Sequence, residues 1–313
     1  MKLVILGNGF DLHHGYKTSF SDFRNHLLKS KKESDKKLIT DIDIVLKSQK
    51  VNLEEGILWN DFERIIGKIM QSGSKTKKIE DIQLLSLAEN FTHRFYDYLI
   101  QEVKKTDFIL NKNINKEIQN SDLILTFNYT NSYIKYLKNN NLDIFHIHGE
   151  LIEHNLPLIG FYYSNVAQYN YTDYLQRYNG KAFHKPALAY KQNGINLEKK
   201  ISQFQAKWSS KISEVVIIGY SFGESDSHIY NILNTILVNQ NQSEYIPFQQ
   251  AKEIPVINFK LFNYNILETN KLIDRLKEKI FSESNRRSSV YITCNGTFSP
   301  EIKDIITFKI IDY

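Results

Sequence analysis

Apolar residues gather in four short runs along the chain, and each run ends in small or polar residues. These stretches read LVILGNGFDL (residues 3–12), LILTFNYT (123–130), IFHIHGEL (144–151) and VVIIGYSFGESD (215–226). A short, continuous apolar run is typical of a strand that is buried on both faces of a parallel sheet. Because ligands bind just past the carboxyl ends of such strands, the four polar ends together predict one shared site at one edge of one sheet.

Between these runs the pattern is largely helical. Residues 20–110 are predicted to be mainly helical, because apolar positions from residue 79 to 103 recur at close to the helical spacing. Residues 162–211, rich in Tyr, Asn and Lys, predict a large, mainly helical insertion over the edge of the site. A further strand is expected near residue 256, and one or two edge strands between residues 288 and 311. The alternation predicts a single α/β domain over residues 1–313, with a Rossmann-like parallel sheet.

Composition narrows the class of protein. A chain of 313 residues with 42% hydrophobic and 24% charged residues has the make-up of a globular protein. Its one cysteine, Cys294, excludes an internal disulfide and a cysteine zinc cluster, which favours a reducing compartment. No signal peptide and no membrane-spanning run is evident, so a cytoplasmic protein is expected. The net charge of +5 raises the alternative of a polyanionic partner, but nucleic-acid binding is not favoured because no compact basic-aromatic motif accompanies it.

The first glycine motif, Gly7-Asn8-Gly9, follows the first apolar run. Glycines there let the backbone approach a phosphate closely, and a helix that begins at this point would favour the anion. Leu12 stands where the dinucleotide-binding fingerprint requires a third glycine, so a plain tight turn remains the alternative.

The second glycine motif, GYSFG at residues 219–223, matches the nucleophile elbow of serine hydrolases around Ser221. In that fold a catalytic histidine comes later in the chain, and the only histidine after Ser221 is His228, in the next predicted helix. We therefore interpret Ser221 as a contact to a ligand phosphate and not as a covalent nucleophile.

Two histidines and one asparagine are the candidates for chemistry. His146 and His148 would share one side of a strand, but no third ligand accompanies them, so a metal site is not predicted. We interpret His146 as a buried core histidine, and His148, which precedes Gly149 at the strand end, as a general base. Asn128 is either a turn-forming residue or a polar anchor for a ribose hydroxyl or a water molecule.

Several motifs taken together resemble the bacteriophage abortive-infection AbiH family. They are GNGFDL, TSFSDF, WNDFE, FNYT, HIHG and GYSFGESD, which span most of the chain. That family is similar to sirtuin-like NAD-binding domains, in which a glycine turn and D-F-R, N-x-D, H-G and G-T-S segments line the NAD site. The corresponding stretches here keep the same order: residues 7–9, 22–24, 128–130, 148–149 and 219–221.

The resemblance implies specific roles and also two departures. It implies that His148 and Asn128 are catalytic. The residues that would contact the nucleotide are Gly7, Asn8, Gly9, Phe10, Asp11, Asp22, Phe23, Arg24, Gly219, Ser221 and Asp226, although helix capping is the alternative for the three aspartates. Thr130 replaces the acid of the N-x-D segment, and the four-cysteine zinc module of sirtuins is absent, so protein deacylation is not expected.

With protein deacylation set aside, the resemblance implies that NAD is cleaved by water, as in the sirtuin-like domains of defence proteins. Nicotinamide leaves as a neutral ring, so no acid is required, and orientation plus a base can lower the barrier to the sugar cation. The expectation is therefore an NAD hydrolase of phage-infected cells that uses no metal and no further cofactor. A phage-derived trigger or partner protein and a homo-oligomer are the other expected partners, without a membrane. A nuclease or other phosphodiesterase, and a nucleotide sensor without turnover, stay open as alternatives.

Overall fold

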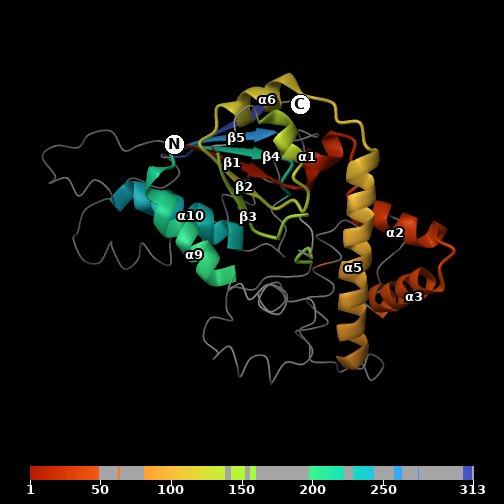
Figure 1. Cartoon of the computed structure of the whole chain (residues 1–313). Helices are drawn as coiled ribbons and strands as arrows, with labels where there is room; N and C mark the ends of the chain where they lie inside the picture. Colours follow the sequence, from red (N-terminus) through yellow and green to blue (C-terminus); the bar gives the residue numbers. More distant parts are fainter. Residues whose placement is uncertain are drawn as a thin grey trace, which may run out of the picture.

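The computed structural model describes residues 1–48, 63, 81–137, 142–151, 156–159, 197–221, 228–242, 257–262, 274 and 306–311. Within these residues the centre of the fold is a sheet of six parallel strands (Figure 1). The strands are β1 (Lys2–Leu6), β2 (Leu123–Thr126), β3 (Asp143–His146), β4 (Glu214–Ile218), β5 (Ile257–Phe262) and β6 (Ile306–Ile311). Their order across the sheet is β3-β2-β1-β4-β5-β6. The predicted α/β fold with a parallel sheet is confirmed, including the edge strand from the C-terminal region.

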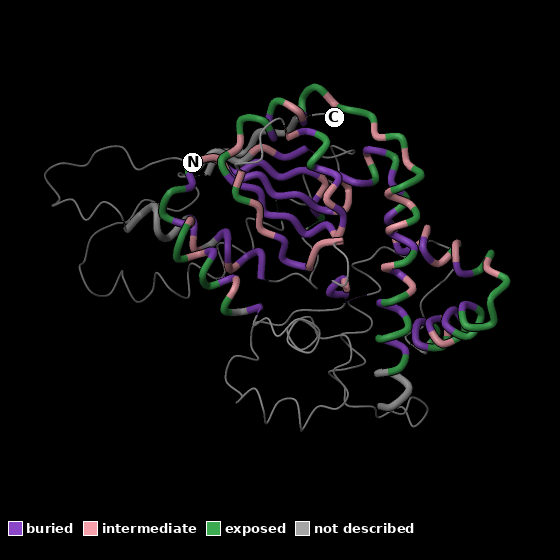
Figure 2. The backbone as a smooth tube through the Cα atoms, in the orientation of Figure 1, coloured by how far each residue is buried: buried purple, intermediate pink, exposed green. Residues whose placement is uncertain are grey.

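The central strands are buried on both faces, as their continuous apolar runs predicted (Figure 2). Successive residues of a strand point to opposite faces, so Leu3 and Ile5 enter one core while Val4 and Leu6 enter the other. The first core contains residues of α9 (Leu197–Trp208) and α10 (His228–Gln242); the second contains residues of α1 (Asn8–His13), α6 (Lys112–Gln119) and η1 (Ser132–Tyr136). Helices therefore cover the sheet on both sides, as parallel strands require.

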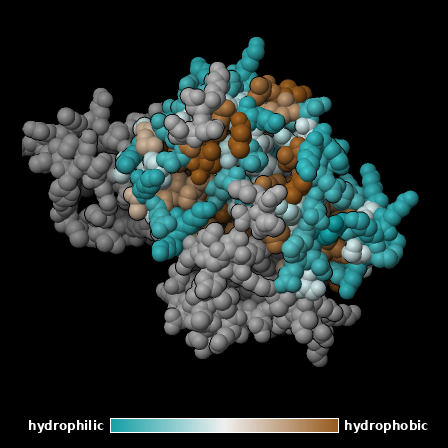
Figure 3. All heavy atoms as spheres, in the orientation of Figure 1, coloured by the Kyte–Doolittle hydropathy of each residue, from teal (hydrophilic) through white to brown (hydrophobic). Residues whose placement is uncertain are grey.

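A third unit of helices lies beyond the carboxyl end of the strands, next to α1 (Figure 1). It consists of α2 (Phe20–Lys29), α3 (Glu33–Ser48) and α5 (Asp81–Lys105). These helices share an apolar core of their own, in which Phe23 of α2 contacts Phe91 and Phe95 of α5 at ring distances of 5.2 and 5.1 Å. Figure 3 shows mostly hydrophilic side chains on the outer surface of this unit. Phe95 also packs edge-on against Tyr129, 5.5 Å away, which ties the unit to the end of β2.

The predicted insertion at residues 162–211 falls mostly outside the described residues. Its described end forms α9 and η3 (Ser209–Lys211), and α9 packs on a face of the sheet through Phe204. The single-domain organisation stays a prediction. Among the helices that the structure describes, none is both long and apolar enough to cross a membrane.

Candidate functional site

The ends of β3, β2, β1 and β4 lie side by side, so the predicted gathering of four polar strand ends at one sheet edge is confirmed. The chain passes from β1 to β2 and β3 on one side, and returns to β4, β5 and β6 on the other side of β1. The strand order thus reverses between β1 and β4. In open α/β sheets the crevice at such a reversal is the usual place for a ligand.

Three glycines bring the turns after β1 and β4 into direct contact. The Gly7 amide donates to the Ile218 carbonyl (3.0 Å), and the Gly9 amide donates to the Gly219 carbonyl (2.8 Å). A Cβ on Gly219 would lie 2.2 Å from the Phe10 nitrogen, and Gly219 also has a φ of +62°. A Cβ on Gly7 would lie 2.5 Å from the Tyr220 Cα. Close packing of the two turns therefore explains these glycines by itself, and their contact with a phosphate stays a prediction.

A buried carboxylate lies at the end of β1, in α1. Asp11 is 1% exposed, and each of its two oxygens accepts a hydrogen bond from a hydroxyl group. The Thr130 hydroxyl donates to Oδ2 (2.6 Å), and the Ser132 hydroxyl donates to Oδ1 (2.5 Å). Burial raises the pKa of Asp11 to about 6, against the lowering effect of hydrogen bonds from Ser132, Thr130 and Asn128. Thr130, which replaces the acid of the N-x-D segment, thus binds a carboxylate that α1 provides.

Asn128 lies beside this carboxylate and is itself 3% exposed. Its backbone amide donates to the Thr126 hydroxyl (3.1 Å), which fixes the turn after β2. Although the side chain is close enough to lower the pKa of Asp11, neither its nitrogen nor its oxygen reaches the geometry of a full hydrogen bond with any group in the described part of the chain. A buried amide without a full partner costs about 1–3 kcal/mol, so its retention requires an explanation such as a ligand. We refer to Asp11, Asn128, Thr130 and Ser132 as the Asp11 cluster.

His148 lies two residues beyond the last residue of β3, and it is 3% exposed. The prediction that His146 and His148 share one side of a strand is therefore wrong, because the strand ends at His146. Its ring packs edge-on against Phe127 (5.3 Å between centroids) and lies 6.1 Å from the Tyr129 ring. The chain turns at Gly149, whose φ is +89°. Phe127 and Asn128 are neighbours after β2, but Phe127 packs beside His148 while Asn128 lies beside Asp11. The structure therefore places the two predicted catalytic residues in two adjacent groups of side chains.

His228 lies among the candidate site residues, although the sequence analysis set it aside. It is the first residue of α10 and is 1% exposed. Its ring stacks on Phe127 (5.4 Å) and lies 5.7 Å from the ring of His148. The position of His228 at the start of the helix after β4 was the available signal, because such a helix begins at the edge of the sheet where the site lies. We refer to Phe127, Tyr129, His148 and His228 as the His148 cluster.

His146 behaves as the core histidine that the sequence analysis proposed. It is buried, and its Nε2 atom is 2.7 Å from the Tyr133 hydroxyl. Burial, together with the nearby Lys200 ammonium, lowers the pKa of His146 to about 4. The ring is therefore uncharged near neutral pH.

Several residues that the resemblance assigned to the nucleotide have other contacts in the structure. The Thr18 hydroxyl donates to Asn8 Oδ1 (2.6 Å), and Phe10 is fully buried in the core beneath α1. Asp22 forms a capping box with Ser19 at the start of α2, which was the alternative given for it. These contacts give each side chain a structural role, and contact with a nucleotide stays a prediction for all of them.

The rest of the assigned set is similarly placed. Phe23 belongs to the core of the helical unit. Arg24 makes a bidentate ion pair with Asp43 (2.9 Å), which joins α2 to α3. Ser221 is exposed after β4, and Asp226 lies outside the described residues. Across the part of the chain that the structure describes, no three His, Cys, Asp or Glu side chains gather as a metal site would require. Metal independence stays a prediction.

Comparison with known proteins gives one family. The family model described as "Bacteriophage abortive infection AbiH" matches residues 3–246, which include both clusters and the strands β1 to β4. A search of curated proteins finds no match.

Proposed function

The chain belongs to the bacteriophage abortive infection AbiH family, and from this premise we propose that it cleaves NAD between nicotinamide and ribose, with water as the acceptor. Membership implies a part in abortive infection, in which an infected cell stops growing before the phage spreads. Loss of NAD would stop growth. The observation that carries the proposal is the Asn128 amide, which is buried beside Asp11 at the carboxyl edge of the sheet without a full hydrogen-bond partner.

The topology supports a nucleotide as the ligand. The order β3-β2-β1-β4-β5-β6 is that of the doubly wound folds that bind dinucleotides at the reversal of strand order. At that reversal lie the turns at Gly7 and Gly219, and the Asp11 cluster borders them. The order of short motifs that resembles sirtuin-like domains leads to the same class of ligand.

The proposed chemistry needs few groups. The nicotinamide ring leaves NAD without a proton, so the site has to hold the ribose, stabilise its developing positive charge and direct a water molecule. Asn128 holds a ribose hydroxyl or the water, and His148 acts as the base. A base of this kind typically contributes about 10²–10⁴-fold to the rate. Both residues are nearly fully buried, which strengthens electrostatic interactions with the sugar cation.

The test is to incubate the purified protein with NAD, with and without EDTA, and to separate the products by chromatography. We expect nicotinamide and ADP-ribose to appear at the same rate in both reactions. The same measurement on extracts of phage-infected cells covers the case in which infection is required for activity. Intact NAD in both settings, beside metal-dependent loss of RNA or DNA, would instead favour a phosphodiesterase.

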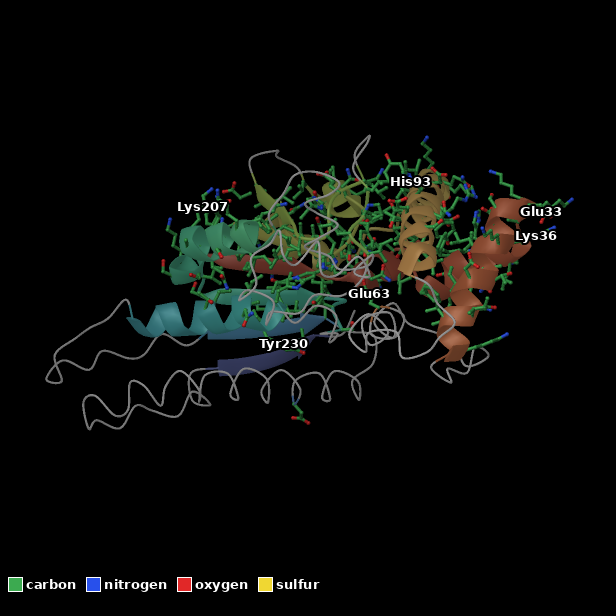
Figure 4. The ribbon with its side chains drawn as sticks, turned by 90° about the horizontal axis from the view of Figure 1, so that it is seen from below. Glu33, Lys36, Glu63, His93, Lys207 and Tyr230 are labelled. Carbon is green, nitrogen blue, oxygen red and sulfur yellow. The ribbon has the colours of Figure 1, made fainter. Side chains whose placement is uncertain are left out.

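A matched control is a histidine outside the site. His93 lies exposed on α5, and Figure 4 shows it on the outer helical unit. We expect His93→Ala to cleave NAD like the wild type. Saturable binding of NAD without nicotinamide release, in wild type and His93→Ala alike, would turn the proposal into that of a nucleotide sensor.

A further inference from the structure

The hydrogen-bonding role of the Asp11 carboxylate is fixed, whereas that of Asn128 depends on which way its side-chain amide is turned. Each Asp11 oxygen already accepts a bond from a hydroxyl group, one from Thr130 and one from Ser132. An ionised carboxylate can only accept hydrogen bonds, whereas a primary amide donates through its nitrogen and accepts through its oxygen. The Asn128 side chain beside it can take two orientations that differ by a half-turn about its terminal bond.

We infer that Asp11 is a positioning residue for Asn128, whose amide nitrogen it turns towards itself so that the amide oxygen accepts a hydrogen bond from the substrate. This inference rests on the proposed function and assigns the polarity of its site. Because the end of the amide that faces away from Asp11 is an acceptor, its partner has to be a donor, which a ribose hydroxyl or the attacking water can be. Asn128 thus selects hydroxyl groups and not carbonyl or phosphate oxygens.

The inference predicts that protonation of Asp11 reverses the arrangement. A protonated carboxyl group can donate to the Asn128 oxygen, which turns the NH₂ group towards the substrate. Burial raises the pKa of Asp11 to about 6, so the change falls within an accessible pH range. Activity should therefore be present above about pH 6 and should decline as the pH falls through that value.

Other titratable groups lie on the elements that carry the Asp11 cluster and on elements near them, and one of them, Tyr16, interacts electrostatically with Asp11. They come from α1, the segment after it, η1, β3 and α9, and are His13, His14, Tyr16, Tyr133, His146 and Lys200. Burial lowers the pKa of the three histidines below the ordinary value of 6.5 and raises that of both tyrosines. Burial also lowers the pKa of Lys200. Asp11 differs from these six groups in being a carboxyl group, and its pKa is about 6.

The test is the pH profile of nicotinamide release by Ser132→Ala. This change removes a hydrogen bond that lowers the pKa of Asp11, so the acidic limb of the profile should move to higher pH by about one unit. Ser213→Ala is the matched control, because Ser213 is exposed before β4, at the opposite end of the strands. Its limb should coincide with that of the wild type. Nicotinamide release with superimposable limbs in all three proteins would overturn the inference and leave the proposed function standing.

A second measurement does not depend on turnover. The side-chain NH₂ resonances of Asn128, assigned by their loss in Asn128→Ala, should shift with a midpoint near pH 6 in the wild type. They should not shift in Asp11→Asn, which cannot ionise. If the wild type releases no nicotinamide, the proposed reaction fails, and this titration alone decides the inference. Asn128 signals that stay constant from pH 5 to 8 in the wild type would refute it.

Discussion

The replacement of Asp11 by asparagine should make the protein more stable at neutral pH, although it removes a functional group. Asparagine has nearly the same shape as the protonated form of aspartic acid and carries no charge. The side chain is 1% exposed, and burial is the main reason why the pKa rises from 3.8 to about 6. The ionised form is therefore the costly one inside the fold.

The magnitude follows from this shift. Roughly two pKa units at about 1.4 kcal/mol each give an ionisation cost of about 3 kcal/mol. Between pH 3.8 and about 6 the folded protein binds more protons at Asp11 than the unfolded chain does. The contribution of Asp11 to stability therefore falls as the pH rises through this window and stays at its lower level above it. Asp11→Asn should gain up to about 3 kcal/mol at pH 8 and close to nothing at pH 4.

Urea unfolding of both proteins at pH 4 and pH 8, followed by circular dichroism, measures the difference. Asp107→Asn is the matched control, since Asp107 is exposed between α5 and α6, and its effect should be small at both pH values. A stabilisation that comes with loss of NAD cleavage would identify Asp11 as a residue kept for function at a cost to the fold. A difference between Asp11→Asn and wild type that is equal at pH 4 and pH 8 would refute the reasoning.

Two further predictions concern the scaffold. Asp35→Asn should lower the free energy of unfolding by about 3–5 kcal/mol, because Asp35 is fully buried in a two-pronged ion pair with Arg94 at 2.7 Å. Since the pKa of Asp35 is lowered in the fold, the difference in unfolding free energy between wild type and Asp35→Asn should shrink in acid. As a control, Glu33→Gln, which breaks the exposed pair with Lys36 whose residues Figure 4 labels, should cost less than about 1 kcal/mol in urea unfolding. Gly219→Ala should abolish soluble expression, because the new Cβ would lie 2.2 Å from a backbone atom. Gly15→Ala, at a φ of +86° with the nearest atom 3.6 Å from the new Cβ, should lower the stability measured in thermal melts by only about 1–3 kcal/mol.

The sheet was predictable from the sequence because its central strands are buried on both faces. Runs such as that at residues 215–218 are continuously apolar, and a short run of this kind, in alternation with helical segments, is typical of a strand in a parallel sheet covered by helices. The carboxyl ends of parallel strands meet at one edge, so the common location of Gly7, Asn128 and His148 also followed. Strand order across the sheet was not encoded in any local pattern.

The contacts within the site were less predictable, because they join residues far apart in the chain. The hydrogen bond from Thr130 to Asp11 spans 119 residues, and no local signal pairs the two. His228 was set aside because it follows Ser221 closely in the next predicted helix, which does not suit the catalytic base of a serine hydrolase. In the structure, the start of α10 brings it to the sheet edge. Asp22 shows the converse, since helix capping, the alternative that the sequence offered for it, accounts for it without a ligand.

The central claim is that Asn128 and His148 carry out NAD cleavage on an intact fold. Nicotinamide release measured beside a thermal melt for Asn128→Ala, His148→Ala and His146→Ala tests it most directly. We expect the first two variants to lose about 10²-fold or more of the activity while they stay folded. His146→Ala, which removes the buried partner of Tyr133, should lower the melting temperature before it lowers the rate. Wild-type turnover by a folded His148→Ala or Asn128→Ala protein would contradict the account.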